Sequence, residues 1–306
     1  MSGKHFSTPA TEKMAGIIIK AISGFFYVHS NGTTFECRAR GSFRNKGTSP
    51  VVGDKVEFTA ENNGKGIIES IKERKNYLSR PNIANIDRAF IVSSYNVPSP
   101  DTNMIDFLSA VCVFNNIDPV IVFNKCDMGS FEKFEKIYNN AGFKVLTVSA
   151  KTGENIDALE SITQNAVCAF IGNSGVGKSS IINAVTGDLD LKTGEVSEKL
   201  GRGRHTTRHT ELFIRDNGGY IVDTPGFSTI DISDNILEFK NRLPFCFPEF
   251  IKYFEFCRFS DCRHISEKGC GVLKAVENGE ISRSRHNSYK KIFEDYKDIR
   301  HWTIRK

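Results

Sequence analysis

Residues 172–179 read Gly-Asn-Ser-Gly-Val-Gly-Lys-Ser, which fits the phosphate-loop pattern G-x-x-x-x-G-K-[ST]. An apolar run over 166–171 predicts a strand before this loop, and 179–185 have the pattern of a helix after it. In such a loop, backbone N–H groups surround the α- and β-phosphates, Lys178 reaches the β- and γ-phosphates, and the Ser179 hydroxyl binds Mg²⁺. Lys178 is therefore a candidate catalytic residue. The predicted nucleotide contacts here are Gly172, Asn173, Ser174, Gly175, Val176, Gly177, Lys178, Ser179 and Ser180.

A second motif, Asn124-Lys125-Cys126-Asp127, directly follows an apolar run at 119–123 and indicates which base is bound. The Asp127 carboxylate can accept two hydrogen bonds from guanine N1–H and N2–H₂, which adenine does not offer. The stem of Lys125 can lie over the purine, and Asn124 can connect loops. Taken alone this tetrad, Cys126 included, is a weak signal, because N-K-x-D arises easily by chance.

Two further motifs also follow predicted strands. Ser149, Ala150 and Lys151 come after the strand predicted from 144, and they would support the base through backbone N–H groups. The sequence D-T-P-G begins at Asp223, whose carboxylate would hold Mg²⁺ through water, while the N–H of Gly226 would meet the γ-phosphate. Strands that alternate with helices imply a doubly wound α/β sheet, and ligands bind at the carboxyl ends of its strands. The four motifs therefore support one another.

The order of these motifs differs from that of ordinary GTPases, in which the phosphate loop precedes N-K-x-D. Here N-K-x-D begins at 124, S-A-K at 149, the phosphate loop at 172 and D-x-P-G at 223. In this order the chain resembles the circularly permuted GTPases, and the resemblance covers nearly the whole chain. It implies an N-terminal barrel, a permuted α/β P-loop GTPase domain and a C-terminal zinc segment. It also implies hydrolysis of GTP to GDP and phosphate, stimulated by the small (30S) ribosomal subunit, coupled to late maturation of that subunit and accompanied by contacts with its rRNA.

The glycine-rich, basic stretch at 201–207 lies where the first switch of a GTPase is expected. Thr206 or Thr207 could ligate Mg²⁺, and the sequence does not say which. Phe227 stands where GTPases commonly carry a water-orienting glutamine, and an aromatic ring cannot activate water by hydrogen bonding. The family resemblance implies His205 as the catalytic residue, since an imidazole can orient or deprotonate water. The alternative is an ordinary surface histidine.

A metal site is predicted from the pattern C-x₄-C-x-H-x₅-C, whose members are Cys257, Cys262, His264 and Cys270. Three thiolates and one imidazole suit one tetrahedral, structural Zn²⁺, and the spacing resembles the family's pattern. The alternative is a set of unligated buried thiols. Cys246 is the nearby cysteine that could compete as a ligand.

The first 78 residues favour a small β-barrel. About five short strands are predicted, with a hairpin turn signal at Asn31-Gly32. An OB-fold fits this number and length of strands, and a different five-stranded barrel fits almost as well. The predicted strands lie in the ranges 16–21, 25–28, 33–39, 51–58 and 66–71.

Charge is distributed unevenly along the 306 residues. The net charge is +5 over 1–78, −4 over 79–231 and +4 over 232–306. Basic ends around an acidic middle favour a polyanionic partner that is touched by the ends. The alternative is a solvated surface with a chance asymmetry.

We therefore predict three domains: an OB-like RNA-binding barrel (1–78), a circularly permuted GTPase domain (79–231), and a mainly helical zinc-binding domain with a basic C-terminal helix (232–306). No stretch approaches ~20 uninterrupted apolar residues, and 1–11 lack an apolar signal core, so we expect a cytoplasmic protein without membrane contact. The sequence offers no oligomer signal, so a monomer is the default expectation. Two other functions stay open. One is an RNA-binding guanine-nucleotide scaffold with negligible turnover, and the other is a non-ribosomal assembly GTPase.

Overall fold

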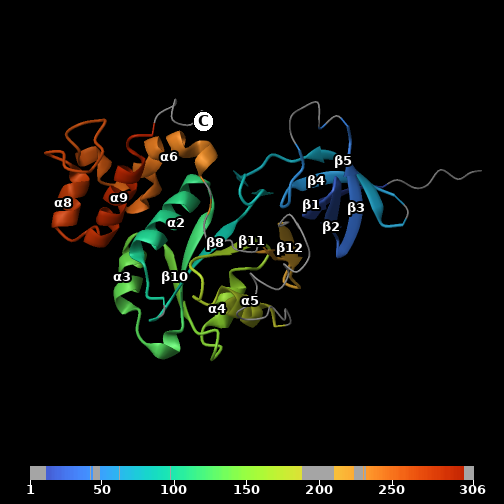
Figure 1. Cartoon of the computed structure of the whole chain (residues 1–306), viewed down its shortest axis with the longest axis horizontal. Helices are drawn as coiled ribbons and strands as arrows, with labels where there is room; N and C mark the ends of the chain where they lie inside the picture. Colours follow the sequence, from blue (N-terminus) through green and yellow to red (C-terminus); the bar gives the residue numbers. More distant parts are fainter. Residues whose placement is uncertain are drawn as a thin grey trace, which may run out of the picture.

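Five strands near the N-terminus close into a barrel in the computed structural model (Figure 1). The model describes residues 12–41, 43, 49–61, 63–96, 98–187, 210–223, 230 and 232–299. The barrel order is β1-β2-β3-β5-β4, and β1 pairs with β4 to complete the closure. Only the β3–β5 pair is parallel within this ring of described strands. The strands are β1 (Glu12–Ile22), β2 (Phe25–Ser30), β3 (Thr33–Ala39), β4 (Lys55–Ala60) and β5 (Lys65–Ile71).

The barrel interior is filled by one inward-facing set of apolar side chains, including Ile18, Val28 and Phe58. Asn31 and Gly32 both have positive φ, which is the backbone that a two-residue hairpin turn requires between β2 and β3. The strand predicted over 51–58 is wrong in its first half. The Asp54 carboxylate accepts a hydrogen bond from the Val51 N–H at 2.8 Å, so this segment forms a turn and β4 begins at Lys55.

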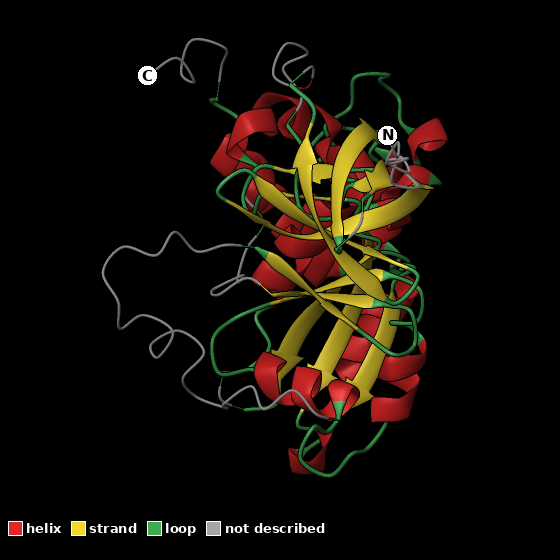
Figure 2. Ribbon diagram, turned by 90° about the vertical axis from the view of Figure 1, so that its right-hand side faces the viewer, coloured by secondary structure: helices red, strands yellow, loops and turns green. Residues whose placement is uncertain are grey.

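The second part of the chain forms a mainly parallel sheet with helices on both faces (Figure 2). Its order is β10-β9-β8-β11-β13-β12, in which β12 alone among these strands is antiparallel to its neighbour β13. Two-residue strands β6 (Tyr77–Leu78) and β7 (Ile83–Ala84) precede it. The strands are β8 (Arg88–Ser94), β9 (Asp118–Asn124), β10 (Lys144–Val148), β11 (Val167–Ile171), β12 (Glu211–Ile214) and β13 (Tyr220–Asp223).

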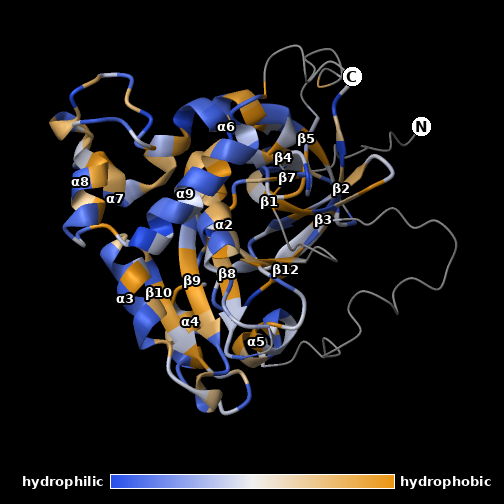
Figure 3. Cartoon of the chain, turned by 60° about the vertical axis from the view of Figure 1, so that its left-hand side comes forward, coloured by the Kyte–Doolittle hydropathy of each residue, from blue (hydrophilic) through white to orange (hydrophobic). Residues whose placement is uncertain are grey.

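Alternating side chains of the central strands serve two separate hydrophobic clusters, because neighbouring residues of a strand point to opposite faces. Ile91 of β8 lies in the cluster that includes α2 and α3, whereas Phe90 lies in the cluster that includes α4 and α5. Figure 3 shows the apolar character of β8, β9 and β10 between these helices. The helices are α2 (Thr102–Phe114), α3 (Glu132–Asn140), α4 (Ile156–Ser161) and α5 (Lys178–Thr186), with a 3₁₀ turn η1 at Cys126–Met128.

The barrel and the parallel sheet are joined edge to edge. Strand β1 pairs antiparallel with β12 at Lys20 and Glu211, so the eleven strands form one continuous sheet. The side chains of the same two residues form an ion pair at 2.8 Å. A second polar contact lies nearby, where His29 Nδ1 and the Tyr220 hydroxyl are 2.8 Å apart.

The C-terminal part is helical and packs on α2. Buried Phe239, Leu243 and Phe247 belong to the same hydrophobic cluster as α2 and the central strands. Helix α9 runs along α2, as Figure 1 shows. Among the described residues no helix is both long and apolar enough to span a bilayer. The elements are η2 (Ser233–Asn235), α6 (Ile236–Arg242), η3 (Leu243–Cys246), α7 (Pro248–Ile251), η4 (Phe254–Phe256), α8 (Gly271–Glu277) and α9 (Arg283–Tyr296).

Candidate nucleotide and metal sites

Three of the predicted motifs meet at one edge of the parallel sheet. Asn124, the last residue of β9, is in register with Val148 of β10 and with Ser94 of β8. Ile171, the last residue of β11, is in register with Ile91. The loops that follow β9, β10 and β11 are therefore neighbours at the carboxyl ends of these strands, where α/β sheets bind ligands.

Glycine is required at two positions of the loop 172–177. Gly172 has φ +137°, and a Cβ there would lie 2.2 Å from the Val92 carbonyl oxygen. Gly177 has φ +93°, and a Cβ would lie 2.3 Å from the Asn124 Nδ2. Both positions combine a left-handed backbone with close contact, which only glycine tolerates. The loop is therefore held against β8 and β9.

The Asn124 side chain connects all three loops. Its Nδ2 donates to the Val176 carbonyl at 2.9 Å, and its Oδ1 accepts from the Ala150 N–H at 3.1 Å. Asn124 is buried, so these bonds are protected from water. The next residue, Lys125, has φ +67°, and its Nζ donates to the Gly175 carbonyl at 3.1 Å. The geometry fixes the base motif relative to the phosphate loop.

Asp127 is exposed and oriented by the third loop. The Ser149 hydroxyl donates to its Oδ1 at 2.7 Å, which leaves Oδ2 available to a base. Lys151, after Ala150, is also exposed. Burial, followed by the nearby Glu154, raises the pKa of the Cys126 thiol to about 11, so Cys126 is protonated at neutral pH.

The first turn of α5 carries Lys178, Ser179 and Ser180, all partly buried. Lys178 Nζ donates to the carbonyls of Gly172 at 2.7 Å and Asn173 at 2.8 Å. Its ammonium therefore lies inside the curve of the loop, and burial lowers its pKa. Phosphate oxygens can replace these carbonyls as acceptors, which makes the loop a suitable phosphate cradle.

Asp223 ends β13, which runs parallel to β11 and so reaches the same sheet edge. The other predicted residues of the catalytic and Mg²⁺ sites, His205, Thr206, Thr207 and Gly226, lie outside the described residues.

The four predicted metal ligands come together. The ligand atoms of Cys257, Cys262, His264 and Cys270 all lie within 4.8 Å of one another. His264 Nδ1 is 3.6 Å from Cys257 Sγ and 3.4 Å from Cys270 Sγ. These separations suit donors that share one tetrahedral ion with Zn–S bonds of about 2.3 Å. Cys246 is not in this group, and its Sγ donates to the Arg242 carbonyl instead.

The surroundings of the cluster suit a metal. Burial raises the pKa of Cys270 to about 12, so its thiolate needs a cation nearby. Burial also lowers the pKa of His264, which favours the neutral imidazole that binds metals. The N–H of Gly271 donates to Cys257 Sγ at 3.4 Å, and that of Leu273 to Cys270 Sγ at 3.5 Å. Such bonds orient sulfur ligands.

Helix α9 holds the backbone of the cluster. His286 Nε2 lies 2.8 Å from the carbonyl oxygen of His264, and the Tyr289 hydroxyl donates to the carbonyl of Arg263 at 2.6 Å. The ring of Phe254 stacks on the His264 imidazole with a centroid distance of 4.7 Å. The Cys₃His cluster is therefore tied by hydrogen bonds to α9, the helix that packs on α2.

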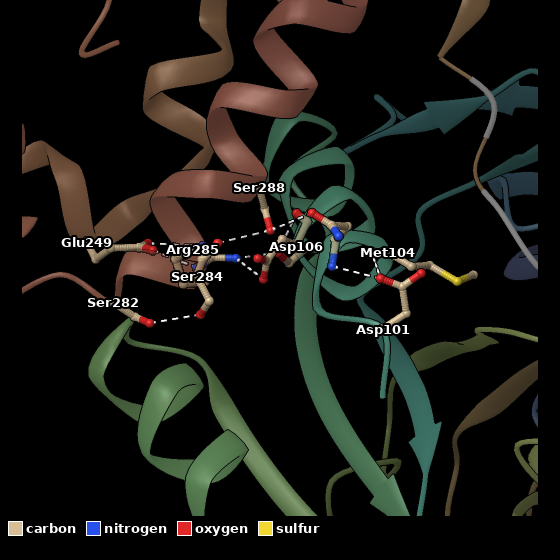
Figure 4. A network of polar contacts seen from close by, with 10 residues as sticks. Asp101, Met104, Asp106, Glu249, Ser282, Ser284, Arg285 and Ser288 are labelled. Carbon is tan, nitrogen blue, oxygen red and sulfur yellow. Dashed lines mark hydrogen bonds and ion pairs between the residues drawn. The ribbon is translucent and has the colours of Figure 1, made fainter. Parts of the chain in front are cut away.

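A buried ionic network links α9 to α2, and sequence patterns did not predict it (Figure 4). Arg285 donates to Glu249 through Nε at 2.7 Å and Nη2 at 3.1 Å, and to Asp106 through Nη1 at 2.7 Å. Arg285 and Asp106 are almost fully buried. Burial opposes the charge of Arg285, but the two carboxylates raise its pKa. The available signal was Asp106 itself, an acidic residue within an apolar helix.

Comparison with known proteins shows the family to which this chain belongs. The model of the RsgA GTPase family matches residues 71–233, more than half of the chain, and that of the RsgA N-terminal domain matches 15–68. This chain belongs to the RsgA GTPase family. The small ribosomal subunit biogenesis GTPase RsgA of Clostridium perfringens (strain SM101 / Type A) is 42% identical over 285 residues, which are 92% of this chain and 98% of the relative. The protein of that name from Clostridium beijerinckii is 44% identical, covering 92% and 97%.

Two solved structures are similar to this chain over more than nine-tenths of its length. The crystal structure of YjeQ from Thermotoga maritima has a TM-score of 0.80 at 34% identity and covers 94% of this chain and 100% of its own. The structure of YloQ, described as a circularly permuted GTPase, has a TM-score of 0.78 at 32% identity, covering 97% and 98%. The predicted fold of an OB-like barrel, a permuted GTPase domain and a C-terminal Cys₃His segment is confirmed.

Proposed function

We propose that this member of the RsgA family hydrolyses GTP and couples hydrolysis to late maturation of the small ribosomal subunit. The observation that carries the proposal is the side chain of Asn124, which joins the base motif, the S-A-K loop and the phosphate loop in one site. Curated relatives that match over more than nine-tenths of the chain are named small ribosomal subunit biogenesis GTPases.

Each motif receives a role in this proposal. The N-K-C-D and S-A-K residues bind guanine, the loop 172–180 binds the phosphates, and the N–H of Gly226 meets the γ-phosphate. Ser179, Asp223 and one of Thr206 and Thr207 would hold Mg²⁺, which would neutralise phosphate charge. Lys178 stabilises the transferred phosphate, and His205 positions or deprotonates the attacking water.

The Cys₃His cluster fits one structural Zn²⁺, because it supplies four protein ligands and so completes a tetrahedral shell. We propose the division into domains 1–78, 79–231 and 232–306, with rRNA contacts from the two basic ends. A cytoplasmic monomer is the form expected to meet the small subunit. The basic residues near the C-terminus support contact with a polyanion.

Purified protein is expected to hydrolyse GTP slowly alone and much faster with small ribosomal subunits, because a partner that completes a GTPase active site can raise the rate by ~10³–10⁵. Steady-state phosphate release, measured with small subunits, large subunits or neither, tests this. ATP in place of GTP is the control for base selection. Equal rates with and without small subunits would end the ribosomal proposal and favour the non-ribosomal assembly GTPase.

The variant His205→Ala separates hydrolysis from a scaffold function. A catalytic imidazole requires a slower single-turnover rate in the variant, with unchanged binding of small subunits. If rate and binding both match the wild type, His205 is not catalytic, and a nucleotide-binding scaffold with negligible turnover becomes the better account.

Asp127→Asn is expected to weaken GTP binding at least about a hundredfold, because an amide cannot accept both guanine hydrogen bonds and faces them with its own donor. Asp127 is exposed, so folding should be preserved. Titration with a fluorescent GTP analogue measures the affinity. Asp157→Asn on α4, also exposed, is the matched control and should bind GTP like the wild type. Equal affinities of the two variants would contradict the guanine assignment.

A further inference from the structure

A groove of about 530 Å³ lies where α2, α3 and α9 meet. Three cationic side chains line it, Lys133 and Lys136 from α3 and Arg283 from α9. Three hydroxyl residues also line it: Thr102, Ser282 and Ser284. We call it the cationic groove. It shares no residue with the predicted nucleotide contacts or with the metal cluster.

The charge of the groove is of one sign. Lys133 and Lys136 are three residues apart on α3 and so lie on one face of the helix. Together with Arg283 they are exposed, and none of the ion pairs found among the described residues involves them. No carboxylate is among the described residues that line the groove. Like charges around a concave surface concentrate the positive potential there.

The end of α9 adds to this potential. Ser282 is the N-cap residue of α9, but its side chain does not cap the helix. The Ser282 hydroxyl is instead 2.9 Å from that of Ser284, and a dashed line joins these two side chains in Figure 4. The first turn of a helix carries partial positive charge from its unpaired N–H groups, and this charge favours anions.

The remaining lining fits a nucleic acid better than an acidic peptide. Phe134 and Ile137 are partly buried and give the groove an apolar component that can contact a ribose or a base. The amide of Asn140 and the hydroxyls can exchange hydrogen bonds with ribose 2′-OH groups. A carboxylate partner would need only the cations.

We propose that the cationic groove binds the sugar–phosphate backbone of RNA. The inference rests on the proposed function, and it names one surface for the rRNA contact. Since α2 and α3 belong to the parallel-sheet layer and α9 to the C-terminal helices, one RNA strand in the groove contacts both parts at once. Phosphates give the affinity, and the hydroxyl residues favour RNA over DNA.

The test removes the three charges in the variant Lys133→Ala/Lys136→Ala/Arg283→Ala. Its control, Lys144→Ala, removes an exposed charge that lies outside the groove and outside the two basic ends. Binding to purified small subunits and to purified small-subunit rRNA is measured between about 50 and 200 mM salt. GTP hydrolysis without RNA should be the same for both variants and the wild type, which shows that the site is intact.

The groove variant should bind both probes at least about tenfold more weakly, with a salt dependence reduced by about two units of slope, as expected for the loss of three phosphate contacts. Lys133→Arg/Lys136→Arg should retain binding. If the groove variant binds rRNA like the control, the inference is wrong. Weakened binding to subunits alone would identify a protein partner and also overturn it. If the wild type binds neither the small subunits nor their rRNA, both the proposed function and the inference of RNA binding in the groove are wrong.

Discussion

Removal of the metal is expected to unfold the segment that carries Cys257, Cys262, His264 and Cys270. Between α7 and α8 this segment contains only the short 3₁₀ helix η4, so a bound ion would supply much of its stability. Structural zinc contributes on the order of 10–16 kcal/mol in isolated zinc fingers, and binding free energy of this kind is folding free energy. We expect a large fall in Tm and the release of one Zn²⁺ per chain on chelation, measured by calorimetry and metal analysis.

Cys262→Ser should reproduce the fall in Tm, because it removes one of the four predicted zinc ligands. Cys262 is partly exposed and the replacement creates no cavity, so lost packing would not explain the fall. Cys246→Ser is the control, because that thiol lies outside the donor group and hydrogen-bonds a carbonyl. It should retain one Zn²⁺. A Cys262→Ser protein with full zinc content and unchanged Tm would show that the four residues are not a metal site.

Arg285→Ala is expected to lower the free energy of unfolding by about 3–5 kcal/mol, because it leaves two buried carboxylates without their cation. The side chains of Asp106 and Glu249 are 0% and 5% exposed, so water cannot replace the lost partner. Burial already raises the pKa of Asp106 despite the attraction of Arg285. Urea unfolding measures the loss of stability.

Arg40→Ala is the control for this prediction. Arg40 pairs with Glu69 at 2.8 Å, but its side chain is 58% exposed, and exposed pairs contribute about 0–1 kcal/mol. The triple variant Arg285→Met/Asp106→Leu/Glu249→Met should recover most of the stability, because apolar residues of similar volume remove the buried charges. If Arg285→Ala and Arg40→Ala lowered the free energy of unfolding equally, the predicted contribution of the buried network to stability would be wrong.

The sequence predicts those parts of the fold in which the chemistry is local. A phosphate loop requires glycine at positions such as 172 and 177 for backbone reasons that any such loop shares, and in the structure Gly172 and Gly177 both have positive φ. The loops that follow neighbouring parallel strands lie side by side at the carboxyl ends of these strands. The contacts of Asn124 with the other two loops therefore follow from the strand order. The ligand spacing of the Cys₃His cluster is likewise a local pattern.

Structural features that depend on contacts between residues far apart in the chain cannot be predicted from such local sequence patterns. Strand β12 has four residues, and its place in the sheet depends on β13 and on β1 of the barrel. The 51–54 segment has strand-like apolar residues, but Arg74 holds Asp54 with bonds of 2.7 and 2.8 Å and Asp54 in turn binds Val51. Arg285 finds its partners 36 and 179 residues away. No window of sequence contains such pairs.

The pairing of β1 with β12 also has a consequence for solubility. Strand β12 is the last strand of the parallel-sheet layer, and its outer edge is covered at Glu211 by Lys20 of the barrel. Unpaired edge strands are templates for intermolecular pairing, which leads to aggregation. A chain that lacks the first 78 residues would present this edge to solvent. The barrel thus covers the β12 edge of the neighbouring sheet and thereby protects it from intermolecular strand pairing.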